Sequence, residues 1–287
     1  MFLLQNVGVL PPSTWLGLWR FWPLVLVLVG FELLLGHRGY LAAILGLLVA
    51  LFALGVALGA GQCGVAGGPA ITRSDAQSLR GASQATVTVR YGAGRLDVGP
   101  LLNAGSDDLS RMNFDGPRDA TPEVQYAVSD GIGRLTYEPS GRSGLGFMPF
   151  LSGRGPAQPR LGVSLTPNVP LSLSLQTGAT EARLDLSRLR VTSLDVSTGA
   201  ASTWIRLPEA AGNTSVHISG GAASLTLEVP DGVAAQIRHQ GGLTTLGVDQ
   251  NRFPAVDAET YRSPGYDTAQ NKIDVTLATG ISTVRVS

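Results

Sequence analysis

A short pattern recurs through the C-terminal two thirds of this chain and constrains its fold more than any other feature. A segment of alternating apolar and polar residues runs into a glycine, and a second alternating segment leaves it. Period-two alternation on both sides of a turn glycine predicts two β-strands with one buried face. Seven glycines lie at the centre of this pattern: Gly92, Gly131, Gly178, Gly199, Gly221, Gly242 and Gly280.

The spacing of these glycines indicates how the strands assemble. From Gly178 to Gly242 they follow at intervals of about 21 residues, and a fixed interval of this size is typical of stacked, similar rungs. The apolar positions keep one register, which only Thr203 and His239 break, so this register is predicted to form the core. The sequence therefore predicts an all-β domain over residues 81–287, a β-solenoid-like stack of two-strand rungs. A β-sandwich is the alternative closure.

The N-terminal region has a different character. Residues 16–35 and 41–60 are almost wholly apolar, and each is about 20 residues long, the length that spans the hydrocarbon core of a bilayer. Only a short loop separates them, so we expect an N-terminal α-helical transmembrane hairpin over residues 16–60. A secretory signal peptide would need a basic segment before one short apolar run, whereas the first basic residue here is Arg20.

Two further segments complete the expected domain organisation. Residues 1–15 look like the end of another apolar segment that Pro11 and Pro12 close, which suggests a membrane helix truncated at its start. Residues 61–80 are rich in glycine, alanine and polar residues, a composition that is typical of a flexible linker. The linker is expected to join the hairpin to the repeat-built domain.

Glu32 is the one acidic residue in the two expected spans. Acidic side chains inside a membrane segment are candidates for function, so Glu32 is a candidate intramembrane polar site. The structural alternative is that Glu32, about one turn from the loop, reaches the interface or pairs with Arg38.

The charge balance limits the partners and the location. The chain has 21 basic and 21 acidic residues and a formal net charge of zero, which argues against nucleic acid as a partner. The expected partner is the lipid bilayer, because of the two apolar spans. Arg20, Arg73 and Arg80 flank the side of the hairpin that carries both chain ends, against Arg38 in its loop. The positive-inside rule then favours a multi-pass cell-membrane protein with a cytoplasmic β domain.

Residues that usually carry chemistry are scarce. The chain has three histidines, His37, His217 and His239, and a single cysteine, Cys63. No two of these lie at metal-ligand spacing, and the sequence contains neither a nucleophile elbow nor a phosphate-binding loop. We therefore predict no catalytic, cofactor-binding or metal-binding residues, no cofactor, and a protein that is not an enzyme.

The positions that alternate with the core register should face outward, and they form the candidate interaction surface. Asp185, Arg206 and Glu228 follow consecutive glycines by seven residues. If neighbouring rungs stack as strands, these three lie about 5 Å apart as an acid–base–acid ladder. Trp204 is predicted to be an exposed aromatic residue on the same face that anchors a partner; the alternative is that it covers a neighbouring side chain.

Both halves of the chain resemble a known family. Residues 19–24, followed by an apolar span, look like the membrane module of the LiaI/LiaF group. Residues 165–171, 197–201, 229–233 and 261–266 are similar to the C-terminal toastrack domain of those proteins. The resemblance implies a membrane-tethered, β-rich domain of a cell-wall-active antibiotic response protein.

The function that this resemblance implies is non-enzymatic sensing or relay in bacterial envelope-stress signalling, by protein–protein contact through the β domain. In LiaF-type proteins the partner is a membrane-bound histidine kinase. An adhesin-like or envelope-structural protein, whose β domain binds surface polymer outside the cell, is the alternative. The side of the membrane that carries the β domain distinguishes the two.

Overall fold

The computed structural model describes residues 70–139, 158–210, 212–241 and 244–287. The chain divides into two compact units, Met1–Ala66 and Gly67–Ser287. The first unit lies outside the described residues, and so do the candidate Glu32 and the whole range 16–60.

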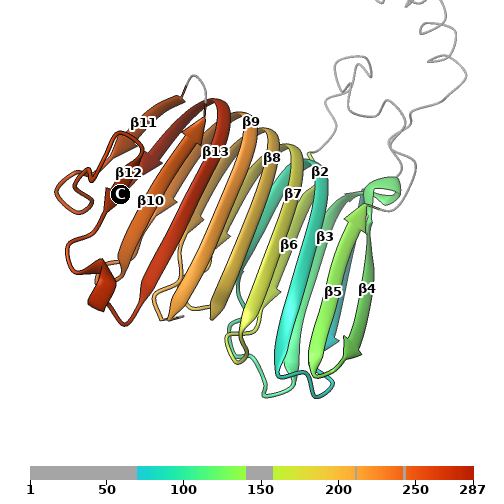
Figure 1. Ribbon diagram of the computed structural model, residues 1–287. Helices are drawn as coiled ribbons and strands as arrows, with labels where there is room; N and C mark the ends of the chain where they lie inside the picture. Colours follow the sequence, from blue (N-terminus) through green and yellow to red (C-terminus); the bar gives the residue numbers. More distant parts are fainter. Residues whose placement is uncertain (1–69, 140–157, 211, 242–243) are drawn as a thin grey trace, which may run out of the picture. The chain divides into compact units, whose positions relative to one another are not determined.

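The described part of the second unit is one sheet system of thirteen strands (Figure 1). Two short 3₁₀ helices, η1 (Arg118–Ala120) and η3 (Tyr266–Thr268), interrupt the strands. The strands are β1 (Ala70–Ser78), β2 (Gln84–Pro100), β3 (Asp108–Pro117), β4 (Pro122–Ser129), β5 (Ile132–Pro139), β6 (Arg160–Leu165), β7 (Leu171–Asp185), β8 (Val191–Arg206), β9 (Asn213–Glu228), β10 (Ala234–Gly241), β11 (Thr244–Val248), β12 (Thr260–Arg262) and β13 (Lys272–Val286).

The helical part of the predicted fold class is wrong for the part of the chain that the structure describes. Strands account for about 69% of it and it contains no α-helix, so the N-terminal helical hairpin is not seen. The physical reason lies in the sequence of these residues, which carries the two-residue period of strands and no 3.6-residue period. Within the described ranges, no helix has the length and the apolar character needed to cross a membrane.

Five long strands define the architecture. Each of β2, β7, β8, β9 and β13 runs for 15 to 17 residues through a central glycine and pairs in parallel with its neighbours on both sides of it. Figure 1 shows these strands turning over along one edge. The residues before the glycines form a first layer and those after them a second layer, with the core between. The short strands extend the layers: β4, β5, β10 and β12 the first, and β1, β3, β6 and β11 the second.

The glycines of the turning edge lie side by side, and we call them the apex row: Gly92, Gly178, Gly199, Gly221 and Gly280. Their role is close approach. A Cβ atom on Gly199 would lie 3.2 Å from the carbonyl oxygen of Gly178, and one on Gly280 would lie 3.1 Å from that of Gly221. Both distances are shorter than ordinary van der Waals contact, so consecutive rungs stack at this spacing because the apex carries no side chains.

Gly131 differs from the other predicted centres. It connects β4 to β5 as an antiparallel hairpin, and both Asp130 and Gly131 have positive φ values, of 54° and 73°. Such Asp-Gly pairs form the tight turns that match the twist of hairpin strands. The rung that continues the stack past β2 consists of β5 and β6, which pair with the first and second halves of β2.

The order of the rungs also departs from the order of the chain. Strand β13 lies between β9 on one side and β10 and β11 on the other. The segment before β13 covers the end of the core, where Phe253 is completely buried. At the opposite end, residues 70–78, within the range expected to be a linker, form β1 and pair with β3.

Candidate functional site

The structure brings the predicted ladder residues into register on the outer face of the second layer. Asp185 lies directly across from Arg206 on the neighbouring strand, and Arg206 lies across from Glu228 on the next. The backbone arrangement that the glycine spacing predicts is therefore present at these three positions.

The side chains of Arg206 and Asp185, however, do not pair with each other as predicted; they interact with residues close in sequence. Arg206 forms its ion pair with Glu209, three residues along its own chain, at 3.3 Å. Asp185 accepts a hydrogen bond of 2.7 Å from the hydroxyl of Ser187. These local partners are reached without extending a long side chain across the strand gap, so they cost less conformational entropy.

Trp204 is the third component of this surface. Its indole Nε1–H donates a 2.8 Å hydrogen bond to Glu228, and the guanidinium of Arg183 lies 4.4 Å above its ring. The residue is half-buried. The ring is therefore partly covered and still presents surface. A ring fixed by a cation–π contact and a hydrogen bond loses little side-chain entropy when a partner packs on it.

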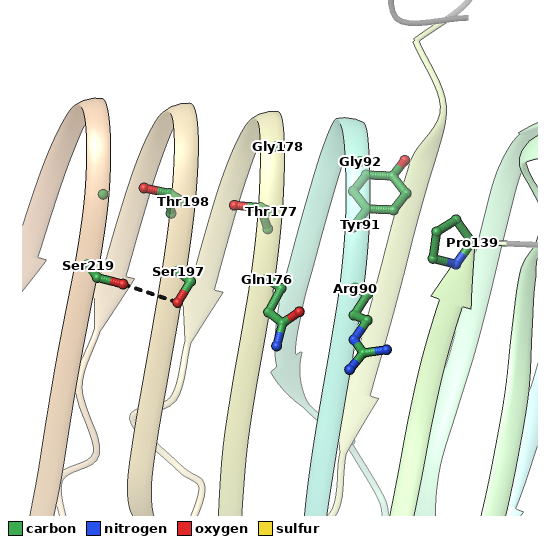
Figure 2. Close-up of a pocket in the computed structure, with 11 residues that line it drawn as sticks. Arg90, Tyr91, Gly92, Pro139, Gln176, Thr177, Gly178, Ser197, Thr198 and Ser219 are labelled. Atoms are coloured by element: carbon green, nitrogen blue, oxygen red, sulfur yellow. Dashed lines mark hydrogen bonds between the residues drawn. The ribbon is translucent and has the colours of Figure 1, made fainter. Parts of the chain in front are cut away.

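A second feature is a shallow groove of about 580 Å³ beside the apex row, on the first-layer side (Figure 2). We call it the apex groove. It crosses β2, β7, β8 and β9, and its lining consists of Arg90, Tyr91, Gly92, Pro139, Gln176, Thr177, Gly178, Ser197, Thr198, Ser219 and Gly220.

The surface that the apex groove exposes is mostly apolar, although several of its described lining residues carry polar groups. The hydroxyls of Ser197 and Ser219 lie 3.1 Å apart and share a hydrogen bond. Arg90 is paired with the carboxylate of Glu138. The hydroxyl of Thr177 is buried in the inward-facing register of β7 and has no hydrogen-bond partner among the described residues.

Sequence reasoning missed this groove. It examined the outward positions seven residues after each glycine, whereas the groove gathers residues two before it. Arg90, Gln176, Ser197 and Ser219 all occupy that position, and their uniformly polar character was the available signal.

Nothing in the described ranges assembles an active site. No group of three metal-ligating side chains occurs among those residues. His217 is exposed, and His239 is half-buried with an Nε2 atom that has no hydrogen-bond partner in the described part of the chain. Burial raises the pKa of Tyr137, which shares a hydrogen bond with Ser110, to about 12.

The comparisons with known proteins agree with this architecture. The family profile of the N-terminal domain of toast_rack, DUF2154, matches residues 67–228. The chain belongs to this family. The resemblance to a toastrack-type, β-rich domain is thereby confirmed, and the LiaF-specific part of it stays a prediction. No curated protein matches the chain.

One of the solved structures that match this chain shares its fold. The crystal structure of a candidate cell adhesion protein from Clostridium sporogenes is similar with a TM-score of 0.66 and 19% identity; the match covers 76% of this chain and 98% of that one. At this identity the likeness shows the fold alone. A candidate adhesin from Bacteroides fragilis covers 76% of this chain and 97% of its own at 14% identity, but its TM-score of 0.26 carries no argument.

Proposed function

We propose that this toast_rack protein is a non-enzymatic scaffold at the bacterial cell membrane that relays envelope stress by docking a signalling protein on its second layer. The observation that carries the proposal is the surface around Trp204. An aromatic ring held between Arg183 and Glu228, and flanked by the charged Arg206, combines the residue types on which binding energy concentrates in protein interfaces.

The rigidity of the ladder supports the same function. The strands that carry this surface, β7, β8 and β9, each have a parallel neighbour on both sides. Such a surface binds without reorganising its backbone, which lowers the entropic cost of association. The partner class that we propose is a membrane-bound signalling protein such as a histidine kinase.

The test compares the outer faces of the two layers in the full-length protein. A triple variant, Trp204→Leu with Arg206→Ala and Glu228→Gln, removes the docking surface. The matched control, Thr88→Ala with Asp195→Ala and His217→Ala, changes three outward residues of the first layer. Cells carrying each variant are treated with a cell-wall-active antibiotic, and the induction of the envelope-stress response is measured beside the melting temperature of the purified protein.

We expect the docking variant to lose most of the response while the control keeps it, at similar melting temperatures. A full response from the docking variant would refute the proposal. Loss of response in both variants at unchanged stability would move the function away from the Trp204 surface.

A further inference from the structure

We propose that the free edge of β4 is a second binding site, and that its ligand is a single extended segment of a partner protein that carries an acidic side chain. The segment would add one strand to the first layer, at the end of the stack opposite to β11 and β12 (Figure 1). This end is separate from the Trp204 surface on β8, so the inference does not rest on the proposed docking function.

The two layers differ in length at this end of the stack. Past the rung of β5 and β6, the first layer has one more strand, β4, whereas the second layer has two, β3 and β1. The first layer therefore ends one strand before the second. The position beside β4, which faces β1, holds no strand of the described residues.

The backbone of β4 offers hydrogen bonds at this position. Within the described ranges β4 pairs with β5 alone, and in an antiparallel pair every second residue directs its N–H and C=O groups away from the partner strand. Counted from the two-residue turn at Asp130 and Gly131, those residues are Val124, Tyr126 and Val128. An extended segment pairs with such a row of backbone groups as an added strand.

The other free edges carry features that hinder strand addition. β11 and β12 have only five and three residues. β1 has a register shift near its end, and its inward register contains two charged residues, Arg73 and Asp75. Short strands, bulges and inward-pointing charges are devices by which sheets block their edges. β4 has eight residues, regular pairing with β5, no charge in its inward register, and a proline only at its first residue.

The longer second layer also limits the size of the ligand. A second copy of this chain that paired its own β4 here would bring its β3 to the place that β1 already holds, because β3 and β4 both follow the rung of β5 and β6. One added strand needs only the position beside β4. The arrangement therefore favours a single extended segment over a second copy.

The charge of the ligand follows from Arg73. This side chain is exposed and belongs to the register of β1 that faces the first layer, and it has no ion pair or hydrogen bond with another described residue. The nearby carboxylate of Asp75 already accepts a 2.7 Å hydrogen bond from the side-chain amide of Gln77. A carboxylate on the added strand would thus meet a guanidinium that can pair with it, whereas a lysine would meet a like charge.

Val128 indicates that the rest of the added strand is apolar on its inner side. This residue belongs to the inward register of β4 with Val124 and Tyr126, yet it is 38% exposed. It is exposed because no described strand follows β4 on this side. An apolar side chain on the added strand would cover it, and burial of this apolar surface would favour binding.

Fluorescence anisotropy with labelled nine-residue peptides and the full-length protein tests the proposal. The acidic peptide has valine at odd positions and threonine at even ones, except for glutamate at the central position; the basic peptide has lysine there. The acidic peptide should bind at least about tenfold more tightly than the basic one. Arg73→Glu should reverse this order, because it changes the sign of the charge that the central residue meets.

The matched control is Arg111→Glu. Arg111 is exposed on the outer side of β3, opposite Ala76 of β1, so it makes the same change of charge on the face that the added strand does not meet. The preference for the acidic peptide should stay within about twofold of the unaltered protein. The melting temperatures of both variants are measured beside the affinities.

A second pair of probes tests backbone pairing in the unaltered protein. The acidic peptide is N-methylated either at its odd or at its even residues, and only one of these two sets of amides can face β4. One methylated peptide should therefore lose at least about tenfold in affinity, while the other keeps more than about a third of it.

Several results would overturn the assignment. These are no binding of the acidic peptide, equal affinities for the acidic and basic peptides, the same reversal in Arg73→Glu and Arg111→Glu, or equal affinities for the two methylated peptides. Self-association of the protein that the acidic peptide reverses, seen by sedimentation, would assign the edge to a second copy. Loss of peptide binding in the Trp204 triple variant would place the peptide on the docking surface instead, whereas unchanged binding there would keep the two sites apart.

Discussion

Adding a single methyl group to the apex row should have opposite effects at two neighbouring glycines. A Cβ atom on Gly178 would overlap the backbone carbonyl oxygen of Gly92, whereas a Cβ on Gly92 would meet no atom of the described residues within 4 Å. Neither glycine has a positive φ value. The substitutions Gly178→Ala and Gly92→Ala are therefore chemically identical, and they differ in the space that receives the methyl group.

The expected magnitudes follow from two opposing terms. Replacing glycine by alanine stabilises a protein by about 0.4–1 kcal/mol where the backbone tolerates it, because the unfolded chain loses freedom. Overpacking against a backbone atom that cannot move aside costs about 1–3 kcal/mol. Gly92→Ala should thus be stabilising, and Gly178→Ala should be destabilising by about 1–2 kcal/mol net. In a domain of this size that is a fall in melting temperature of about 2–8 °C.

The rest of the apex row extends this pair to a graded series. The nearest carbonyl oxygen would lie 3.1 Å from a Cβ on Gly280, 3.2 Å on Gly199 and 3.4 Å on Gly221. Alanine at these positions should lower the melting temperature in that order, with Gly178→Ala below all three. Thermal unfolding of the full-length protein, followed by circular dichroism at the strand band, measures the series. Equal shifts at Gly92 and Gly178, or a fall at Gly92, would refute the view that close stacking selects glycine.

Two further perturbations test the core. Phe253→Ala should destabilise the protein by about 3–5 kcal/mol, because this fully buried ring covers the core beside β13. A urea titration measures the loss. Leu102→Ala is the control: its side chain is 66% exposed, so the midpoint should stay unchanged. Tyr137 has its pKa raised from 10.0 to about 12 by burial, so its contribution to stability is complete below pH 10 and is lost as the pH rises toward 12. Tyr137→Phe should flatten this alkaline loss, and an unchanged pH slope would contradict the assignment.

How much of the fold could be predicted depends on which contacts are local. The core register could be predicted, because alternation is a property of neighbouring residues. Val87 and Val89, which belong to this register, are 1% and 2% exposed. Thr203, which breaks the apolar pattern, is buried all the same at 4%, since the pleat directs it inward whatever its polarity. The insertion of β13 between β9 and β10 could not be predicted from the sequence, because lateral strand order depends on contacts between distant segments.

The candidate surfaces show the same division at the level of side chains. Glycine spacing predicts that Asp185 and Arg206 face each other across a strand gap, and they do. It does not predict that Asp185 accepts a hydrogen bond from Ser187 or that Arg206 pairs with Glu209, because side-chain rotamers depend on the nearest partner in the folded chain. The Asp130-Gly131 dipeptide carried a usable signal for a hairpin, but the periodic pattern around it was given more weight.

The bent strands explain how one ladder can offer two unrelated surfaces. A strand that turns over at a glycine presents its residues before the turn on one outer face and those after it on the other, with a shared core between. On β8, Ser197 and Trp204 are only seven residues apart in sequence and lie in different layers. Changes on one face therefore leave the other face's backbone register intact, because that register depends on the apex row and the core. This separation is what allows the two triple variants, one on each layer, to be compared with each other.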